Sequence, residues 1–306
     1  MLEQGHPVAF VMTLASDVAA KFYAVFDYAP LCDKYKIPLY YIRDINDDRS
    51  IETLKQFDLD LLFVIGWSQI LQPKALASAR IGVVGAHASL LPANRGSGPI
   101  SWTLIKGETQ TGNTLMWLSA GVDQGDVIDQ TAFPITPHDT CATLYDRVAE
   151  SNRTMILRLL TALSNGQRPG RPQPRTLEPL LPRRRPEHGI VNWELGSRQI
   201  YDFIRALTHP YPGAFSWLNG DRYFIWQCAV LPLETVLPQY PPGTVIGPVY
   251  SPLAGGCGQM VSCGTGAILL LAVEDAQGQE ITGYALSEQQ WQGKRWLNPV
   301  TEKGQT

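Results

Sequence analysis

The chain has 306 residues, of which 44% are hydrophobic and 17% are charged, with a formal net charge of −3 at pH 7. This length allows one large domain or two modest ones with buried cores, and the slight acidic balance argues against nucleic acid as the main partner. No apolar run is long enough to span a membrane, and the first residues lack the features of a secretory signal. The five widely spaced cysteines predict reduced thiols in a cytoplasmic protein.

The first half of the chain alternates short apolar runs with helical patterns. Runs rich in Val, Ile, Phe and Tyr predict strands at residues 8–13, 37–42, 60–66 and 81–86. Helices are expected at residues 16–34 and 49–57, with Ser16–Asp17 and Asp47–Asp48 as their polar caps. Because strands and helices alternate and the strands are almost wholly apolar, we predict a doubly wound, mostly parallel α/β sheet covered on both faces.

The remaining elements predict a second, smaller domain. A short helix at 97–106, paired strands at 113–119 and 126–133, and a long amphipathic helix at about 138–164 complete the first domain, residues 1–165. Residues 166–189 are dense in Pro, Arg and Gly and predict a linker that wraps the surface. Residues 190–306 contain a helix at about 195–207 and then short strands with Gly and Pro turns, which predict a β-rich open barrel similar to the OB fold.

Two titratable residues stand where predicted strands end. His87 follows the strand at 81–86, and Asp123 lies between the paired strands. Ligands of doubly wound sheets bind beyond the carboxyl ends of the strands. An imidazole can take or give a proton at neutral pH, and a neighbouring carboxylate fixes its tautomer and stabilises its cation. This pair is therefore a candidate for proton transfer, although a histidine at a strand end is also a common structural feature.

The residues around this pair resemble the 10-formyltetrahydrofolate-dependent formyltransferase family. The segment HASLLPANRG at 87–96 is followed by GVDQGDVI at 121–128, and the spacing from His87 to Asp123 fits as well. Upstream, FVIGWSQIL at 63–71 resembles the family segment that lines the folate pocket with backbone groups. The C-terminal formyltransferase domain is similar to RRRPEHGIVNW at 183–193 and RALTHPYPGAFSWLNG at 205–220.

The resemblance implies an enzyme that transfers a formyl group from its co-substrate, 10-formyltetrahydrofolate, to a primary amine. It assigns proton transfer to His87 and the orientation of this ring to Asp123. The implied folate and substrate loop consists of Ser89, Leu90, Leu91, Pro92, Arg95 and Gly96, together with Gly66, Trp67, Gln69 and Ile70 from the upstream segment. Ser89, Arg95 and Gly96 are interpreted as loop architecture. No metal site is predicted, because the other histidines lack a carboxylate pattern.

One position departs from the family pattern. Relatives have an asparagine two positions before the histidine, and here that position is Gly85. Losing one donor to the developing oxyanion typically costs about 10²–10³ in rate. Three interpretations stay open: a modified but active transferase, a weakened or non-catalytic folate-binding relative, and a hydrolase of the formyl group. A backbone N–H or a water could replace the donor, Asn94 is a remote candidate, and Gly85→Asn should raise activity if the donor matters.

The beginning of the chain also differs from the pattern. Family members usually open with a strand and a helix, and Met1 falls inside that helix. The missing strand would be central in the sheet, so its loss would expose the edges of the strands beside it. We therefore expect the native start to lie upstream of Met1.

The sequence leaves the amine acceptor open. The segments at 183–193 and 205–220 look most like those of formyltransferases that act on amino-sugar nucleotides, and the net charge of −3 agrees with a small substrate. Methionyl-tRNA formyltransferases share the two-domain layout, so tRNA is the alternative, and an intermediate of peptide synthesis is a third. No membrane partner is expected, and the oligomeric state is not predicted.

Overall fold

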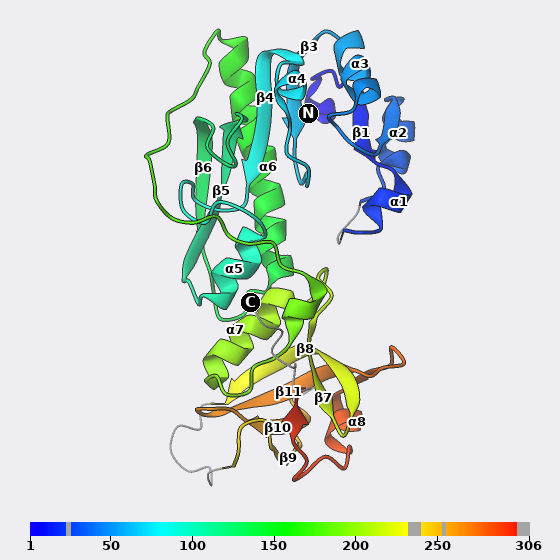
Figure 1. Cartoon of the computed structure of the whole chain (residues 1–306), viewed down its shortest axis with the longest axis vertical. Coiled ribbons are helices and arrows are strands. Elements are labelled where there is room, and N and C mark those ends of the chain that lie inside the picture. Colours follow the sequence, from blue (N-terminus) through cyan, green and yellow to red (C-terminus); the bar gives the residue numbers. More distant parts are fainter. Residues whose placement is uncertain (23–25, 232–239, 253–254, 299–306) are drawn as a thin grey trace, which may run out of the picture. The chain divides into compact units, whose positions relative to one another are not determined.

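The computed structural model describes residues 1–22, 26–231, 240–252 and 255–298. The chain divides into two compact units (Figure 1). The first unit contains residues 1–99, 110–134 and 145–182. The second unit contains residues 100–109, 135–144 and the chain from residue 183 onward.

Among the described residues, six strands of the first unit form two sheets. In the smaller sheet, β1 (Val11–Leu14) and β2 (Leu39–Ile42) pair in parallel. The larger sheet has the order β3 (Leu59–Val64), β4 (Ala79–His87), β5 (Gln110–Trp117) and β6 (Val127–Pro134). β3 and β4 are parallel, whereas β4, β5 and β6 are antiparallel to their neighbours. Among the described residues, β1 is paired with β2 alone and β3 with β4 alone. The predicted α/β fold class is confirmed.

The helices of the N-terminal region agree only in part with the prediction. The chain begins with a short 3-10 helix, η1 (Leu2–Gln4). The prediction of a single helix at 16–34 is wrong, because α1 (Ser16–Ala19) and α2 (Ala29–Tyr35) are separate helices. Pro30 stands in the first turn of α2, where its missing N–H and fixed φ favour a helix start over a helix interior. Residues 23–25 lie outside the described part. The expected cap at Ser16–Asp17 is also wrong, because Ala15 is the N-cap and makes no side-chain bond.

The helix predicted at 49–57 is confirmed as α3 (Asp48–Gln56). Its N-cap is Asp47, whose Oδ1 accepts a hydrogen bond from the Ser50 N–H at 2.6 Å. This bond satisfies one of the backbone donors that have no partner in the first turn of a helix. The beginning of α3 is thus fixed by a local interaction that the sequence pattern contains.

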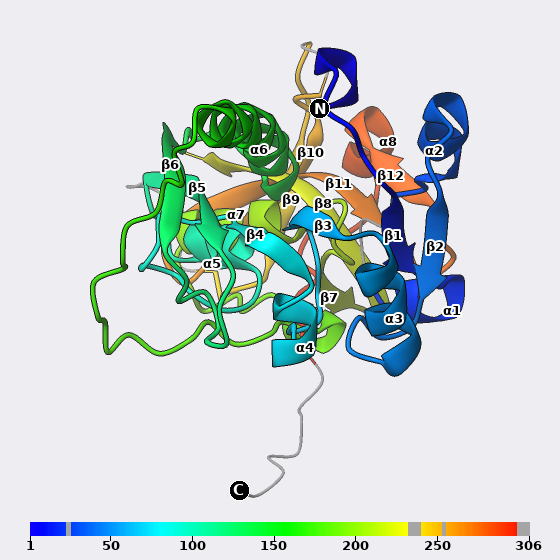
Figure 2. The same ribbon diagram turned by 90° about the horizontal axis from the view of Figure 1, so that it is seen from above.

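Helices cover both faces of β4. On one face, Val84 belongs to a core cluster with Met155 and Leu159 of α6 (Cys141–Ser164), and Figure 2 shows α6, viewed nearly end-on, beside this part of the sheet. On the other face, Val83 belongs to a cluster with residues of α3 and of α4 (Pro73–Leu76). Neighbouring side chains of a strand point to opposite faces. This explains why the strand that ends in His87 is apolar almost throughout.

The second unit is rich in β-structure, as predicted. Its helical elements are α5 (Pro99–Ile105), η2 (Pro186–Gly189), α7 (Ser197–Leu207) and α8 (Gly283–Ser287). Its strands are β7 (Ala214–Leu218), β8 (Asp221–Leu231), β9 (Val245–Val249), β10 (Gly258–Ser262), β11 (Ala267–Glu274), β12 (Glu280–Thr282) and β13 (Trp296–Leu297).

These strands form one antiparallel sheet in the order β13-β7-β8-β11-β10-β9, with β12 beside β11. Its two edge strands approach each other just before they begin. A bridge joins Thr244 to Arg295, and the Trp296 N–H donates to the Gly243 carbonyl at 2.9 Å. Contact between the two edges curls the sheet into a barrel that is joined at one end.

Candidate active site

His87 is the last residue of β4, and both of its ring nitrogens face oxygen atoms. Nε2 lies 2.8 Å from the carbonyl oxygen of Asn94. Because a carbonyl oxygen only accepts, Nε2 carries the proton in this arrangement. Nδ1 lies 3.5 Å from Oδ2 of Asp123, and the two side chains are only 8% and 17% exposed. The structure therefore brings together the two residues that the sequence singled out.

The position of each hydrogen follows from this geometry. With Nε2 protonated, a neutral ring presents the lone pair of Nδ1 to the Asp123 carboxylate. A doubly protonated ring instead donates toward Asn94 and Asp123 at once. The distance of 3.5 Å is longer than an ordinary hydrogen bond and shortens if Nδ1 takes up a proton. The arrangement can accept a proton at Nδ1 and stabilise the resulting cation.

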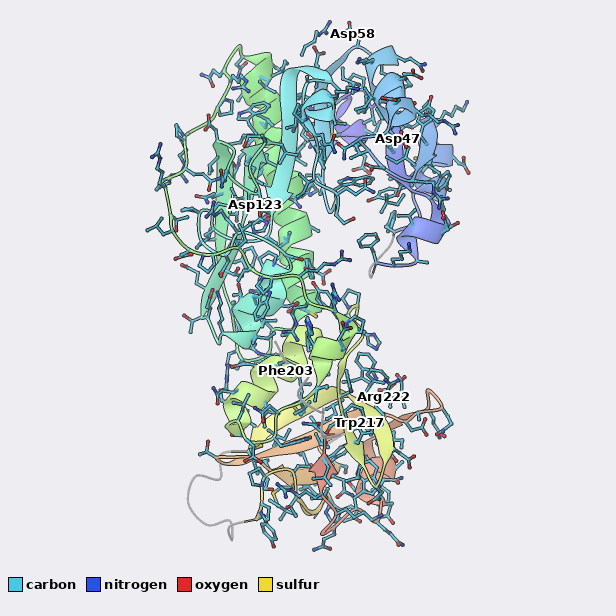
Figure 3. The ribbon with its side chains drawn as sticks, viewed as in Figure 1. Asp47, Asp58, Asp123, Phe203, Trp217 and Arg222 are labelled. Atoms are coloured by element: carbon cyan, nitrogen blue, oxygen red, sulfur yellow. The ribbon has the colours of Figure 1, made fainter. Side chains whose placement is uncertain are left out.

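Asp123 is held in the turn between β5 and β6 (Figure 3). Its backbone has φ 52°, in the left-handed region that few residues other than glycine adopt. Oδ2 accepts a hydrogen bond from the Gly96 N–H at 2.9 Å, so one oxygen faces both Gly96 and His87. At Gly96 a Cβ atom would lie 2.5 Å from the Leu181 carbonyl oxygen, and φ is 110°. A side chain at position 96 would therefore push apart the backbone that orients Asp123.

The loop that follows His87 is stabilised mainly by its own polar groups. Ser89 Oγ donates to the Ala93 carbonyl at 2.7 Å, and the Thr114 hydroxyl donates to the Ser89 carbonyl at 2.7 Å. The same hydroxyl accepts from the Leu91 N–H at 3.1 Å, just before the cis peptide bond between Leu91 and Pro92.

Leu90 and Arg95 are also engaged by neighbouring parts of the chain. The Leu90 side chain fills the space over Gly112, where an added Cβ would lie 2.4 Å away. Arg95 Nη2 donates to the Glu178 carbonyl at 3.3 Å. These contacts support the interpretation of Ser89, Arg95 and Gly96 as loop architecture. Thr114 was not predicted, although the alternating pattern of its strand places it on the same face as Gly112.

The upstream segment is attached to the loop between β2 and α3. The side-chain amide of Gln69 accepts from the Ile45 N–H at 2.9 Å and donates to the Arg43 carbonyl at 2.8 Å. Asn46 Nδ2 donates to the Ile70 carbonyl at 3.0 Å, while the Ile70 side chain is 68% exposed. Gln69, predicted as a folate-site residue, thus has its polar atoms engaged within the protein.

Trp67 differs from its neighbours in the surroundings of its indole nitrogen. Among the described residues, Nε1 of Trp67 is buried and has no hydrogen-bond partner. Gly66, directly before it, follows β3 with φ 64°. A buried donor without a partner is costly, so an acceptor atom of a bound ligand would stabilise this segment.

The space beside Gly85 is filled by Leu118. An added Cβ at position 85 would lie 2.5 Å from Cδ2 and 2.9 Å from Cγ of Leu118. The Leu118 backbone is fixed, because its N–H donates to the Val83 carbonyl at 2.8 Å. An asparagine at position 85 therefore requires Leu118 to move. Asn94 meets His87 through its carbonyl, an acceptor, so this contact supplies no oxyanion donor.

Two further properties concern metals and membranes. Within the described ranges, no three His, Cys, Asp or Glu side chains gather as ligands for a metal ion. No helix in the part of the chain covered by the structure is long and apolar enough to cross a membrane.

Comparison with protein families identifies both parts of the chain. The formyl transferase family model matches residues 3–160, and the model of the formyl transferase C-terminal domain matches residues 184–290. The chain belongs to the formyltransferase family. A methionyl-tRNA formyltransferase from Syntrophus aciditrophicus (strain SB) is 36% identical over 195 residues, which are 64% of this chain and 62% of that relative.

Solved structures share the fold of this formyltransferase family member at low identity. HypX from Aquifex aeolicus in complex with tetrahydrofolic acid has a TM-score of 0.62 at 18% identity, covering 89% of this chain and 45% of its own. An N-formyltransferase from Helicobacter canadensis in complex with folinic acid and dTDP-3-aminofucose has a TM-score of 0.58 at 18% identity, covering 80% and 84%. Methionyl-tRNA formyltransferase from Clostridium thermocellum has a TM-score of 0.55 at 18% identity, covering 72% and 92%.

Proposed function

We propose that the protein transfers a formyl group from 10-formyltetrahydrofolate to a primary amine, with His87 and Asp123 as its proton-transfer pair. The observation that carries this proposal is the buried ring of His87 at the end of β4, 3.5 Å from Asp123 Oδ2. Both residues fall in the part of the chain that matches the formyl transferase family model, residues 3–160. The position also agrees with the usual place of ligands in α/β sheets.

His87 takes up the proton that the amine loses as it attacks the formyl carbon, and Asp123 stabilises the imidazolium. The formyl-folate supplies an electrophilic carbon and a leaving nitrogen, N10, that ends with the proton. The new bond joins the amine nitrogen to the formyl carbon, and the bond from this carbon to N10 breaks. Trp67 supports folate binding, because its buried indole N–H has no partner among the described residues.

The test is release of tetrahydrofolate from 10-formyltetrahydrofolate in the presence of candidate amines. His87→Ala should lower kcat by about 10²–10⁴, the usual contribution of a positioned acid or base. His138→Ala is the matched control, because His138 is exposed and outside the proposed pair. Equal rates for wild type and His87→Ala would contradict the proposed role of His87.

For the acceptor, we favour an amino-sugar nucleotide, because a net charge of −3 suits a small substrate better than a polyanion. The 36% identical relative supports methionyl-tRNA as the second candidate. The two candidate acceptors differ in how their binding responds to salt. Binding of tRNA should weaken steeply as salt is added, whereas binding of a sugar nucleotide should change little.

A weakened, folate-binding relative is the remaining alternative, and one observation favours it. The apolar side chain of Leu118 occupies the space beside Gly85, where the family pattern has a hydrogen-bond donor. Folate binding without formyl transfer to any amine, and without release of formate, would support this alternative. Release of formate without an amine would support the hydrolase.

A further inference from the structure

The segment after α6, predicted as a linker that wraps the surface, is hydrogen-bonded to the strands and loops of the first unit. It runs past β6 and returns across the unit, as the long green trace in Figures 1 and 2 shows. The backbone of Arg171 pairs with Val127 in both directions, at 2.8 and 2.9 Å. Further on, the Leu181 N–H donates to the Arg95 carbonyl at 2.7 Å, and the Ser97 N–H donates to the Leu181 carbonyl at 3.0 Å. We call residues 171–181 the strap.

Between these two attachments, one side chain of the strap binds the turn that carries Asp123. Nε2 of Gln173 donates to the Asp123 carbonyl at 3.0 Å and to the Gly125 carbonyl at 2.7 Å. Both amide hydrogens are therefore used on the same turn. The turn is tightly packed, since an added Cβ at Gly125 would lie 1.6 Å from the Trp117 carbonyl oxygen. Asp123 itself is held at φ 52°, a conformation that needs support from its surroundings.

The other end of the strap acts on the carboxylate of Asp123. Leu181 pairs with the backbone on both sides of Gly96, and the Gly96 N–H donates to Asp123 Oδ2 at 2.9 Å. The strap thus fixes the backbone of Asp123 through Gln173 and its carboxylate through Leu181 and Gly96. We propose that Gln173 is a positioning residue, which holds Asp123 so that its carboxylate faces Nδ1 of His87.

This inference rests on the proposed function for its kinetic consequence, but its structural consequence can be measured without turnover. Gln173→Leu keeps most of the side-chain volume and removes both donors. It should lower kcat about tenfold, as expected for two lost hydrogen bonds, with KM for folate and amine unchanged. Gln173→Glu should do the same, because a carboxylate cannot donate to the two carbonyl groups. Gln167→Leu, an exposed position on the same connection, is the control.

The test independent of activity is the ¹⁵N NMR spectrum of the His87 ring in the ligand-free protein, assigned by its loss in His87→Ala. Gln173→Leu should move the Nδ1 signal toward its position in Asp123→Asn, and Gln167→Leu should leave it in place. In an Asp123→Asn background, Gln173→Leu should have no further effect on kcat or on the Nδ1 signal. If Gln173→Leu fails to fold, Gln173→Glu carries the same comparison.

The two proposals fail in different ways. An unchanged Nδ1 signal in both Gln173 variants would overturn the positioning role, as would effects of Gln173→Leu and Asp123→Asn that simply add. A shifted Nδ1 signal in a protein that formylates no amine would support the positioning role and overturn the proposed function.

Discussion

Replacing Gly85 by asparagine tests whether the site lacks an oxyanion donor. The structure predicts that this substitution alone is insufficient to restore the donor. Its Cβ would lie 2.5 Å from Cδ2 of Leu118, well inside van der Waals contact. The backbone of Leu118 is bonded to Val83, so only the leucine side chain can move. Overpacking of this kind costs about 1–3 kcal/mol. We therefore expect Gly85→Asn to destabilise the protein by about this amount and to raise kcat little.

The double variant Gly85→Asn/Leu118→Ala removes the obstacle. Leu118→Ala deletes the carbon atoms that lie within 3.2 Å of the added Cβ and leaves room for the amide. A restored donor to the oxyanion is worth about 10²–10³ in rate, or roughly 2.7–4 kcal/mol. The double variant should therefore exceed wild type in kcat, whereas Leu118→Ala alone should only lose stability.

The measurements are tetrahydrofolate release for kcat and urea denaturation for the free energy of unfolding. A full gain from Gly85→Asn alone would show that Leu118 does not occupy this space in solution. No gain from the double variant would show that another group already stabilises the oxyanion. Either result would refute the argument from the contact between Gly85 and Leu118.

Three further predictions concern stability and backbone geometry. Asp202→Ala should destabilise the protein by about 3 kcal/mol in urea denaturation, because it leaves the buried Arg205 guanidinium without its carboxylate. Glu150→Ala, at an exposed ion pair, should cause no measurable change. Equal effects of the two substitutions would contradict the role of burial. Gly96→Ala should lower both stability and kcat, because the new methyl group meets the Leu181 backbone. Gly98 has open space around it, so Gly98→Ala should retain more of the activity. Similar losses in both variants would show that the contact with Leu181 is unimportant. Burial raises the pKa of the Cys141 and Cys263 thiols from 9.0 to about 12. These thiols therefore ionise at a lower pH in the unfolded chain than in the folded protein, and the free energy of unfolding should fall as pH rises above about 9. Urea denaturation at about pH 8 and about pH 10 should show this fall, and a smaller one in Cys263→Ala, whereas an equal fall in that variant would assign it to other groups.

Local patterns were sufficient for much of the fold. The apolar runs predicted β1 to β4, and Asp47 predicted the start of α3, because both depend on residues near in sequence. The single helix expected at 16–34 was wrong because Pro30 favours the start of a new helix over a position inside one, although the helical periodicity continues through it. The β-rich second unit was predicted from its turns, although the contact between its edges at Thr244 and Arg295 has no local signal.

The candidate site was predictable where motif and strand end coincide, as at His87. Its remaining parts come from distant segments. Gln173 lies 50 residues beyond Asp123, in a segment whose Pro, Arg and Gly content is typical of a linker. A single hydrogen-bonding side chain leaves no periodic pattern in a sequence. In the same way, Gly85 can be read from the motif, but the leucine that fills its space comes from beyond the next strand.

The bond from His87 Nε2 to the Asn94 carbonyl has a consequence for turnover. Because Nε2 already carries the proton in this bond, the proton of an attacking amine in the proposed reaction goes to Nδ1, on the side of Asp123. The proposed reaction therefore needs the amine to approach the ring from that side, while the bond to Asn94 keeps the ring in its orientation.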